Sequence, residues 1–373
     1  IVHMNDQNTD QSLGLPEQTH SNEGGTVSER PTIAAVALAA GVSRQTISNA
    51  INAPERVRPE TLKRVLATIE ELGFRPNVAA RQMRTGRSQL LAMRIEPVRD
   101  GVNGVVGDRF LHALAEAAQF AGYRMLLCTA KNDAEELAEY EQLRDTMALD
   151  GVILATTHTG DPRREWLADH DLPFMSFGRP WASQSLSGGA EAPDSNWVDV
   201  DGAAGTAAAT AELISRGHQR IAYLGWPTGS DVGNERRSGW VGSMTKGGLA
   251  VDGLEASSED DIEEAVGAVE QLLDSSPTAI VCASDTLAVA SAAVLNRRSL
   301  RPGADVSVVG FDDTPAARAL GIASVLQPLD RVAEACVAGI LDQLNNRPRS
   351  GQGQLLAPEL VLRSTLADPA QQT

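Results

Sequence analysis

From Gln89 onward the chain alternates short, continuously apolar runs with segments whose apolar residues recur at helical spacing. Seven runs have this character: LLAMRI, YRMLLCTA, GVILAT, LPFMSF, RIAYLGW, TAIVCAS and VSVVGF. Because strands buried on both faces are apolar throughout, these runs indicate a parallel sheet. Helical patterns lie between them, at residues 108–121, 134–148, 203–216 and 286–296. This alternation predicts a doubly wound α/β fold, and the length of the segment favours two lobes.

Residues 31–74 follow a different pattern, which predicts three short helices. Thr32 and Ser43 are suited to cap the first two, because a hydroxyl oxygen can accept a hydrogen bond from a free backbone N–H. Gly41 between them supplies a tight turn. Pro59 starts the third helix, which has one continuous apolar stripe. Short helices joined through a glycine turn in this way form a helix-turn-helix.

The second helix, RQTISNAIN, has an outer face whose side chains suit DNA. In a helix-turn-helix this helix enters the major groove, and its first residues meet base edges. Arg44 can pair two acceptors on guanine, and Gln45 can pair adenine through a donor and an acceptor. Ser43 and Thr46 can bond phosphates and fix the register. The candidate DNA contacts are Ser43, Arg44, Gln45, Thr46, Ser48 and Asn49. A bundle that docks another protein is the alternative.

The distribution of charge bears on the same question. The protein has a formal net charge of −17, which by itself argues against nucleic acid. Residues 31–88, however, hold nine basic side chains against four glutamates, a net charge of +5, so the remaining residues carry −22. Such asymmetry is typical of a basic nucleic-acid module joined to an acidic body. A solvated basic helical subdomain is the competing interpretation.

Composition argues against several other classes of protein. The 373 residues and the hydrophobic content of 42% are typical of a globular protein with two or three domains. The six histidines lack metal-binding spacing and the three cysteines form no CxxC pair, so we expect no metal and no cofactor. No apolar run reaches the ~20 residues of a membrane-spanning helix, and the polar N-terminus lacks the order of a signal peptide. We therefore expect a cytoplasmic, nucleoid-associated protein without a membrane partner.

Seven segments resemble, in order and spacing, the successive signatures of the lactose-repressor (LacI/GalR) family. They are VALAAGVSRQTISNAIN, VRPETLKRVLATIEELGFRPNVAARQMRTGRS, DGVILAT, RGHQRIAYLG, TAIVCASDTLAVA, DVSVVGFDD and LQPLD. The resemblance implies an all-α helix-turn-helix headpiece, a hinge helix and an α/β two-lobed effector domain like the periplasmic sugar-binding proteins. It also implies a homodimer on a near-palindromic operator, with a small ligand, usually a sugar, that alters operator affinity.

Five parts of the chain follow from this resemblance and from composition. The first is a polar tail that we expect to be disordered, and the three residues before Met4 look like a remnant of cloning. The expected boundaries are 1–30 for this tail, 31–74 for the helix-turn-helix domain, 75–88 for the hinge helix and linker, 89–365 for the effector-binding and dimerisation domain, and 366–373 for a C-terminal tail.

By position, the resemblance places further DNA contacts in the hinge and at the end of the second helix. Asn49 occupies a base-contacting position where the family often has Arg, so the outer operator bases are not assigned. In the hinge, Asn77 and Ala80 match the family. From the residues alone, Met83 is best interpreted as covering a domain joint. The resemblance reverses this, because the family has an apolar residue there that wedges between base steps in the minor groove.

The effector site is also assigned by the resemblance. The pattern RRSGW places Arg236 where the family binds ligand hydroxyls or carboxylates. Asp312, after the run VSVVGF, matches an acidic residue that takes paired sugar hydroxyls, and Asp285 is a further candidate. We expect Arg236 and Asp312 on opposite lobes of a polyol site, because each hydroxyl can both donate and accept. A structural salt bridge or a strand-end cap is the alternative role.

The segment SFGRPWASQSLSGGAEAPDSNWVDVD departs from the family pattern, with Gly178 and Arg179 where many relatives have Asp-Arg. It contains Trp181 and Trp197, in a chain with only 4% aromatic residues. Because indole faces stack on the C–H surfaces of sugars, both are candidate effector contacts. The alternative, which the sequence supports equally, is that these tryptophans pack in the core.

These features predict a sequence-specific DNA-binding transcriptional regulator, a repressor whose operator affinity changes when a small sugar binds between the lobes. A regulator with a non-sugar corepressor, or a sugar-binding protein without a role on DNA, is the alternative. An enzyme on this fold is disfavoured, because the sequence has no P-loop, nucleophile motif or metal cluster.

Overall fold

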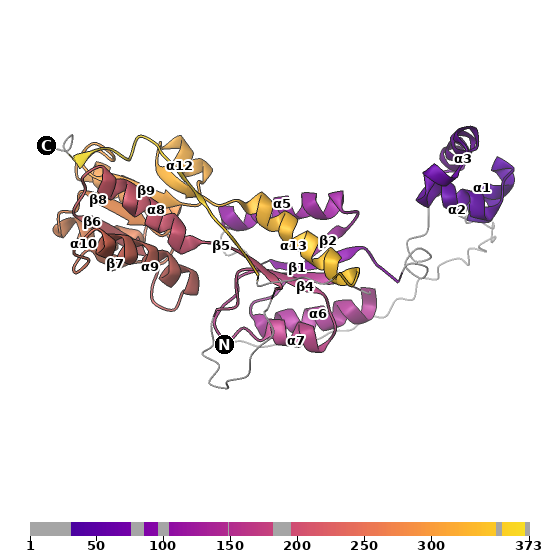
Figure 1. Ribbon diagram of the computed structural model, residues 1–373, viewed down its shortest axis with the longest axis horizontal. Coiled ribbons are helices and arrows are strands. Elements are labelled where there is room, and N and C mark those ends of the chain that lie inside the picture. The colour runs from indigo at the N-terminus through magenta and orange to yellow at the C-terminus, as the bar shows by residue number, and fades with distance from the viewer. Residues whose placement is uncertain are drawn as a thin grey trace, which may run out of the picture. The chain divides into compact units, whose positions relative to one another are not determined.

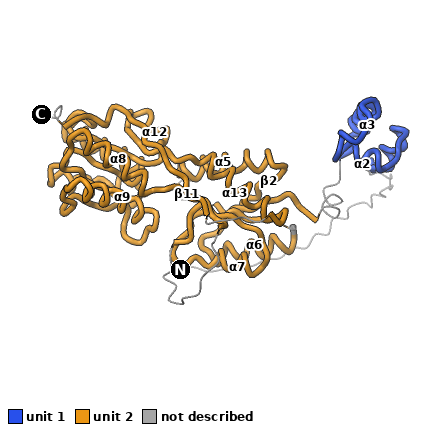
Figure 2. The backbone as a smooth tube through the Cα atoms, viewed as in Figure 1, with its two compact units in different colours: residues 1–85 blue, residues 86–373 orange. Residues whose placement is uncertain are grey.

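The computed structural model describes residues 31–75, 86–95, 104–147, 149–181, 195–347 and 353–369. The chain divides between residues 85 and 86 into two compact units, which we call the headpiece and the effector domain (Figure 2). The tail at 1–30 and the three predicted hinge contacts, Asn77, Ala80 and Met83, lie outside the described residues.

The headpiece begins with a helix-turn-helix, as predicted. Its elements in the described residues are α1 (Ile33–Ala40), α2 (Arg44–Asn52), the 3₁₀ turn η1 (Pro54–Arg56) and α3 (Pro59–Glu71). Thr32 and Ser43 cap the first two helices through their hydroxyl oxygens. Gly41 ends α1 at a φ of 64°, in the left-handed region. A side chain at this position would cost about 1–2 kcal/mol, so glycine fits the turn best.

The three helices of the headpiece enclose one small apolar core. Its buried residues are Val36, Ala37, Ala40, Ile47, Ala50 and Val65. Ile47 and Ala50 were predicted to face inward, and Ile51, the third predicted residue, is half-buried against the same core. Arg64 of α3 donates from Nε to the carbonyl oxygen of Ala40 at 3.1 Å, which ties α3 to the end of α1.

The effector domain contains two six-stranded sheets among its described residues (Figure 1). Sheet 1 has the order β11-β5-β4-β3-β1-β2, and all its neighbouring strands are parallel. Its strands are β1 (Leu90–Ile95), β2 (Arg124–Thr129), β3 (Gly151–Leu154), β4 (Phe174–Phe177), β5 (Trp197–Val200) and β11 (Gln354–Leu356).

Sheet 2 has the order β12-β10-β9-β8-β6-β7 and is parallel except where β10 meets β12. Its strands are β6 (Ile221–Gly225), β7 (Glu255–Ser257), β8 (Ala279–Cys282), β9 (Ser307–Phe311), β10 (Ala323–Leu326) and β12 (Glu359–Val361). The seven apolar runs of the sequence form β1, β2, β3, β4, β6, β8 and β9, which confirms the prediction of a doubly wound fold.

Helices cover both faces of each sheet. In lobe 1, built on sheet 1, α5 (Val105–Phe120) and α13 (Leu329–Leu344) lie on one face, and α6 (Asp133–Met147) and α7 (Arg163–Asp169) lie on the other (Figure 1). In lobe 2, built on sheet 2, α8 pairs with α9 and α10 pairs with α11. The helices of lobe 2 are α8 (Gly202–Ser215), α9 (Asp231–Lys246), α10 (Ala265–Asp274), α11 (Asp285–Arg297) and α12 (Pro315–Ala319).

The described chain passes between the lobes at three places. It leaves β5 for α8 at Asp201, leaves β10 for α13 near Pro328, and leaves β11 for β12 at residues 357–358. Ligands of doubly wound folds bind beyond the carboxyl ends of the parallel strands. The segments that follow β4, β6 and β9, together with the crossing after β5, therefore border the junction between the lobes.

Gly239 of α9 sets how closely α8 and α9 approach. A Cβ on this residue would lie 2.1 Å from the carbonyl oxygen of Ala203 and 2.3 Å from Oγ1 of Thr206, whereas a Cβ on Gly242 in the same helix would meet nothing within 4 Å. We expect Gly239→Ala to lower the free energy of unfolding by about 1–3 kcal/mol, because it overpacks the contact. Gly242→Ala should raise it by about 0.5–1 kcal/mol, since alanine favours the helix.

Urea unfolding followed by tryptophan fluorescence measures both effects in the full-length protein. All five tryptophans lie beyond residue 86, so the signal reports on the effector domain. Equal and small effects of the two substitutions would show that the α8–α9 contact tolerates extra volume, against this prediction.

Candidate functional site

The first turn of α2 presents polar side chains to solvent. Arg44 and Gln45 are exposed, and Thr46, Ser48 and Asn49 are half-buried. The hydroxyl of Ser43 accepts from the backbone N–H of Thr46 at 3.1 Å, so this side chain caps the helix. Its Oγ also shares a hydrogen bond with Oγ1 of Thr46 at 2.9 Å, so one of these two hydroxyls keeps a proton that it can donate to a phosphate.

Gln45 and Asn49 are coupled on this surface. The amide Nε2 of Gln45 donates to Oδ1 of Asn49 at 3.0 Å, one helical turn further on. This bond orients the Gln45 amide. It leaves the amide oxygen of Gln45 available to accept a hydrogen bond. An Arg at position 49, which has no acceptor, would not make this bond. The Asn that departs from the family pattern therefore holds the neighbouring candidate base reader in place.

In the effector domain, Arg236 lies buried at the edge of sheet 2, with 6% of its surface exposed. Its Nη1 donates to the carbonyl oxygen of Ala283 at 2.5 Å, and its Cζ lies 3.7 Å from the ring centroid of Phe311 and 5.1 Å from that of Trp226. Its Nη2 lies 3.6 Å from Oδ1 of Asp312. Its Nε is buried and has no hydrogen-bond partner among the described residues. The guanidinium thus keeps one donor for a ligand.

Asp312 directly follows β9 and faces Arg236. Its φ of 107° is rare for a residue with a side chain, and Nε2 of Gln327 donates to its Oδ1 at 2.6 Å. Burial raises the pKa of the Asp312 carboxyl to about 7, against the opposing effect of Arg236. A strained backbone and a perturbed pKa at one residue are typical of a binding site.

The expectation that Arg236 and Asp312 lie on opposite lobes is wrong. Arg236 belongs to α9, which follows β6, and Asp312 follows β9, and both strands are in sheet 2. Because the carboxyl ends of parallel strands meet at one edge, the two residues come together within lobe 2. Lobe 1 reaches this pair through Arg109 of α5, whose Nη1 donates to the backbone oxygen of Asp312 at 2.8 Å.

Asp285 lies behind this pair rather than beside it. It is the first residue of α11 and only 1% exposed. One carboxylate oxygen accepts from the backbone N–H of Thr314 at 2.6 Å, and the other accepts from Oγ of Ser324 at 2.6 Å. These bonds hold the loop that carries Asp312. The arrangement supports a positioning role for Asp285, which was a candidate effector contact.

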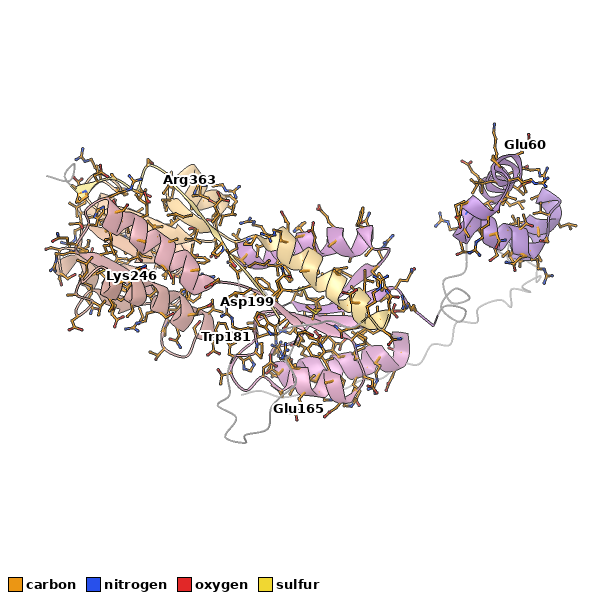
Figure 3. All side chains as sticks on the ribbon, in the orientation of Figure 1. Glu60, Glu165, Trp181, Asp199, Lys246 and Arg363 are labelled. Carbon is orange, nitrogen blue, oxygen red and sulfur yellow. The ribbon has the colours of Figure 1, made fainter. Side chains whose placement is uncertain are left out.

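Arg179, on the segment after β4, joins the two lobes. Its Nε donates to Oδ2 of Asp199 in β5 at 2.7 Å, and its Nη2 lies 2.7 Å from Oε1 of Glu235 in α9. Its Cζ lies 5.0 Å from the ring centroid of Trp181. Figure 3 shows Trp181 and Asp199 on the side of lobe 1 that meets lobe 2. The sequence indicates Arg179 only as part of an unusual loop and gives no signal for Glu235 beyond its place directly before the motif RRSGW.

Trp197 and Trp181 lie in different surroundings. Trp197 is the first residue of β5, and a Cβ on Gly353 beside β11 would come within 2.1 Å of its indole. Trp197 therefore packs against the neighbouring strand, which supports the structural alternative for this residue. Trp181 lies at the lobe junction beside Arg179, and its buried Nε1 has no hydrogen-bond partner among the described residues.

One group of acidic and histidine side chains in lobe 1 has the spacing of metal ligands. Asp133, His158 and Asp161 each offer a ligand atom within 4.8 Å of the others. Arg163, which is buried, lies 2.6 Å from Oδ2 of Asp161 and 3.6 Å from Oδ1 of Asp133. Because a guanidinium already neutralises these carboxylates, the group is better suited to tie α6 and α7 together than to hold a cation.

Comparison with known proteins decides the family. Residues 32–77 match the description "Bacterial regulatory proteins, lacI family", and residues 210–366 match "Periplasmic binding protein-like domain". The chain is 31% identical to the HTH-type transcriptional regulator CelR of Thermobifida fusca, over 90% of this chain and 98% of that protein. The chain belongs to the LacI family. It is accordingly a DNA-binding transcriptional regulator with a helix-turn-helix headpiece.

Solved structures agree with this assignment. A structure of a transcriptional regulator CelR–cellobiose complex is 28% identical, with a TM-score of 0.65, and covers 90% of this LacI-family chain and 100% of that chain. The Lac repressor dimer bound to operator and the anti-inducer ONPF is 24% identical, with a TM-score of 0.72 over 90% of this chain and 99% of that one, and shows the shared fold. No described helix of this LacI-family protein is long and apolar enough to cross a membrane.

The raised pKa of Asp312 makes the stability of this LacI-family protein depend on pH. An unfolded aspartate has a pKa of ~3.9, so the carboxyl of Asp312 binds its proton more tightly in the folded protein than in the unfolded chain. Protonation of Asp312 therefore stabilises the fold, and this stabilisation is lost as pH rises towards and through 7. Asparagine carries no charge at any pH. We therefore expect the melting temperature of Asp312→Asn, measured relative to that of the wild type, to be higher at pH 8 than at pH 5.5.

Differential scanning fluorimetry at these two pH values, both above the sequence pI of about 4.8, checks this. Asp313→Asn is the matched control. Burial tends to raise the pKa of Asp313, but hydrogen bonds from Arg318 and Arg363 outweigh it and lower that pKa. This control should lose a similar number of degrees at both pH values. An Asp312→Asn difference that does not grow with pH would contradict the assignment.

Proposed function

We propose that this protein is a repressor that binds a near-palindromic operator as a homodimer and responds to a small sugar held at the Arg236–Asp312 pair. The pair carries the proposal, because a buried guanidinium with an unpartnered Nε faces a carboxylate beside two aromatic rings. Such a site offers both donors and acceptors to hydroxyls and apolar faces to sugar C–H groups. The similar CelR structure contains cellobiose, which supports a saccharide.

On the DNA side, we propose that Arg44 and Gln45 read base edges in the major groove. Both side chains are exposed at the start of α2, and the bond from Gln45 to Asn49 fixes the Gln45 amide. Ser43, Thr46 and Ser48 border them and are proposed to contact phosphates. The hinge contacts Asn77, Ala80 and Met83 are proposed from the family resemblance.

The proposed dimer face lies on lobe 1. β2 is an edge strand of sheet 1, and α5 lies beside it. Phe120 at the end of α5 is 98% exposed and Leu127 in β2 is 43% exposed. Leu111, Ala115 and Met125 line a hollow between the same two elements. Because a monomer rarely leaves a patch of this kind in water, a second copy of the chain is the proposed partner.

We infer that the sugar acts by shifting the relative position of the lobes. Arg109, Arg179 and Thr159 of lobe 1 bond to Asp312, Glu235 and Asp231 of lobe 2, respectively. A ligand between them changes operator affinity only to the extent that it binds one lobe arrangement better than the other. In this proposal the protein acts on operator DNA in the cytoplasm, by binding and not by catalysis. A non-sugar corepressor at the same site is the second candidate.

The base-reading role of Arg44 has a direct test. We expect Arg44→Ala to cost about 1–3 kcal/mol at one base pair in each half-site and to relax specificity there. Electrophoretic mobility shift with operators substituted at single positions measures this. Lys63→Ala, which removes one exposed positive charge from α3 of the same headpiece, is the control and should weaken all sequences about equally. If Arg44→Ala lowers the affinity for every sequence equally, Arg44 contacts phosphate and not a base.

The effector proposal is tested by titrating saccharides into a complex of the protein with fluorescent operator. Anisotropy should fall as the sugar releases the repressor, and a rise would mean that the ligand is a corepressor. Arg236→Gln removes the buried guanidinium and should abolish the response at saccharide concentrations that saturate the wild type. Arg237→Gln is the control, because Arg237 is half-exposed and pairs with Glu255 on the surface of lobe 2. Loss of the response in both variants would assign the effect to α9 folding.

A further inference from the structure

We propose that Arg179 and Glu235 form a second sugar-reading pair, so that the effector is a saccharide of two rings, the first at Arg236–Asp312 and the second at Arg179–Glu235. This inference rests on the proposed function and makes its ligand more specific. A monosaccharide would engage the first pair alone. The second pair would then decide which saccharides the protein recognises.

The two pairs are direct neighbours at the lobe crossing. Glu235 and Arg236 are consecutive in α9, and both side chains lie against Gly202, the first residue of α8. A Cβ on Gly202 would come 2.9 Å from Oε2 of Glu235 and 3.1 Å from Cγ of Arg236. A residue without a side chain therefore stands between the pairs, where any larger residue would press on both. The two pairs thus approach the same backbone position at the crossing between the lobes.

The second pair repeats the chemistry of the first. Each has a guanidinium facing a carboxylate, at 3.6 Å for Arg236–Asp312 and 2.7 Å for Arg179–Glu235. Each guanidinium also lies over an indole, Trp226 at 5.1 Å for Arg236 and Trp181 at 5.0 Å for Arg179. A donor, an acceptor and an aromatic face are the three features that a pyranose ring uses, and the junction provides them twice.

One buried donor at each pair has no hydrogen-bond partner in the described part of the chain. They are Nε of Arg236 and Nε1 of Trp181. Arg236 is only 6% exposed. Leaving a buried donor unsatisfied is costly, so such atoms mark places where a bound molecule supplies the acceptor. Hydroxyl and ring oxygens of a saccharide that spans the two pairs would supply one to each.

The bonds of the second pair do not engage all of its polar atoms. The bridge between the lobes uses Nη2 of Arg179 and Oε1 of Glu235, and Asp199 takes Nε of Arg179. Nη1 of Arg179 and Oε2 of Glu235 are thus the atoms proposed to donate to and accept from ring hydroxyls. Burial raises the pKa of Glu235 to about 7 in spite of Arg179, because Asp199 and Asp201 add negative charge nearby. Hydroxyl donors from a ligand would stabilise its charged form.

Isothermal titration calorimetry on the full-length protein tests this with glucose, galactose, cellobiose, maltose and lactose. We expect the tightest disaccharide to bind at least about tenfold more strongly than either monosaccharide, the effect of one or two further hydrogen bonds to charged groups. Glu235→Gln, which keeps the size of the side chain, should weaken that disaccharide about tenfold and change monosaccharide affinity less than about twofold. Arg179→Gln should act in the same direction.

Glu255→Gln is the matched control, since Glu255 pairs with Arg237 on the exposed side of the same helix and should affect neither ligand class. Equal losses for mono- and disaccharides in Glu235→Gln would assign the pair to lobe closure and overturn the second ring site. Unchanged binding of mono- and disaccharides in Glu235→Gln would also overturn the second ring site, but it would leave the proposal of a sugar effector standing. If the wild type binds none of the five sugars, the proposal of a sugar effector is itself wrong. This outcome depends on the wild type alone, so it is distinguishable from a failure of the second ring site.

Discussion

A buried guanidinium has to be neutralised or hydrogen-bonded, and much of lobe 2 is arranged around this requirement at Arg236. The carbonyl oxygen of Ala283, the ring of Phe311 and the carboxylate of Asp312 surround it. Gly239 lets α9 approach α8 closely enough to bring the arginine to the edge of sheet 2. Asp285 in turn fixes the loop that carries Asp312. The site is therefore rigid within lobe 2, and what a ligand can change is the position of lobe 1 relative to it.

The contacts between the lobes differ in kind from those within them. Each lobe has its own buried apolar cores, whereas the contacts across the junction that involve Arg109, Thr159 and Arg179 are hydrogen bonds and an ion pair. Polar contacts can exchange with water at little net cost, so the lobes can separate without exposing a core. This difference permits two arrangements within a few kcal/mol, which is the range in which a ligand shifts a population.

Local patterns in the sequence predicted local structure well. The hydroxyl caps of α1 and α2 and the seven strands with continuous apolar runs depend on neighbouring residues, so the sequence predicted them directly. The strands β5, β7, β10, β11 and β12 were missed. Three of them, β7, β11 and β12, are edge strands of three residues each, which is too short to show a pattern. The Arg179–Glu235 bridge joins residues far apart in sequence, and which strand ends meet at one edge depends on strand order. For the same reason Arg236 and Asp312 were placed on opposite lobes.

The division of charge explains why DNA recognition is confined to a small unit. Residues 31–88 carry +5 and the remainder of the chain −22, so the acidic remainder, most of which lies in the effector domain, repels the phosphate backbone while residues 31–88 are attracted to it. At physiological salt the Debye length is about 8 Å, so acidic charges farther than this from the DNA are largely screened, whereas the direct contacts of α2 are not. Added salt weakens the attraction through counterion release and also weakens the repulsion. Operator affinity should consequently fall less steeply with salt than the number of phosphate contacts alone would require, because the acidic body offsets part of the dependence.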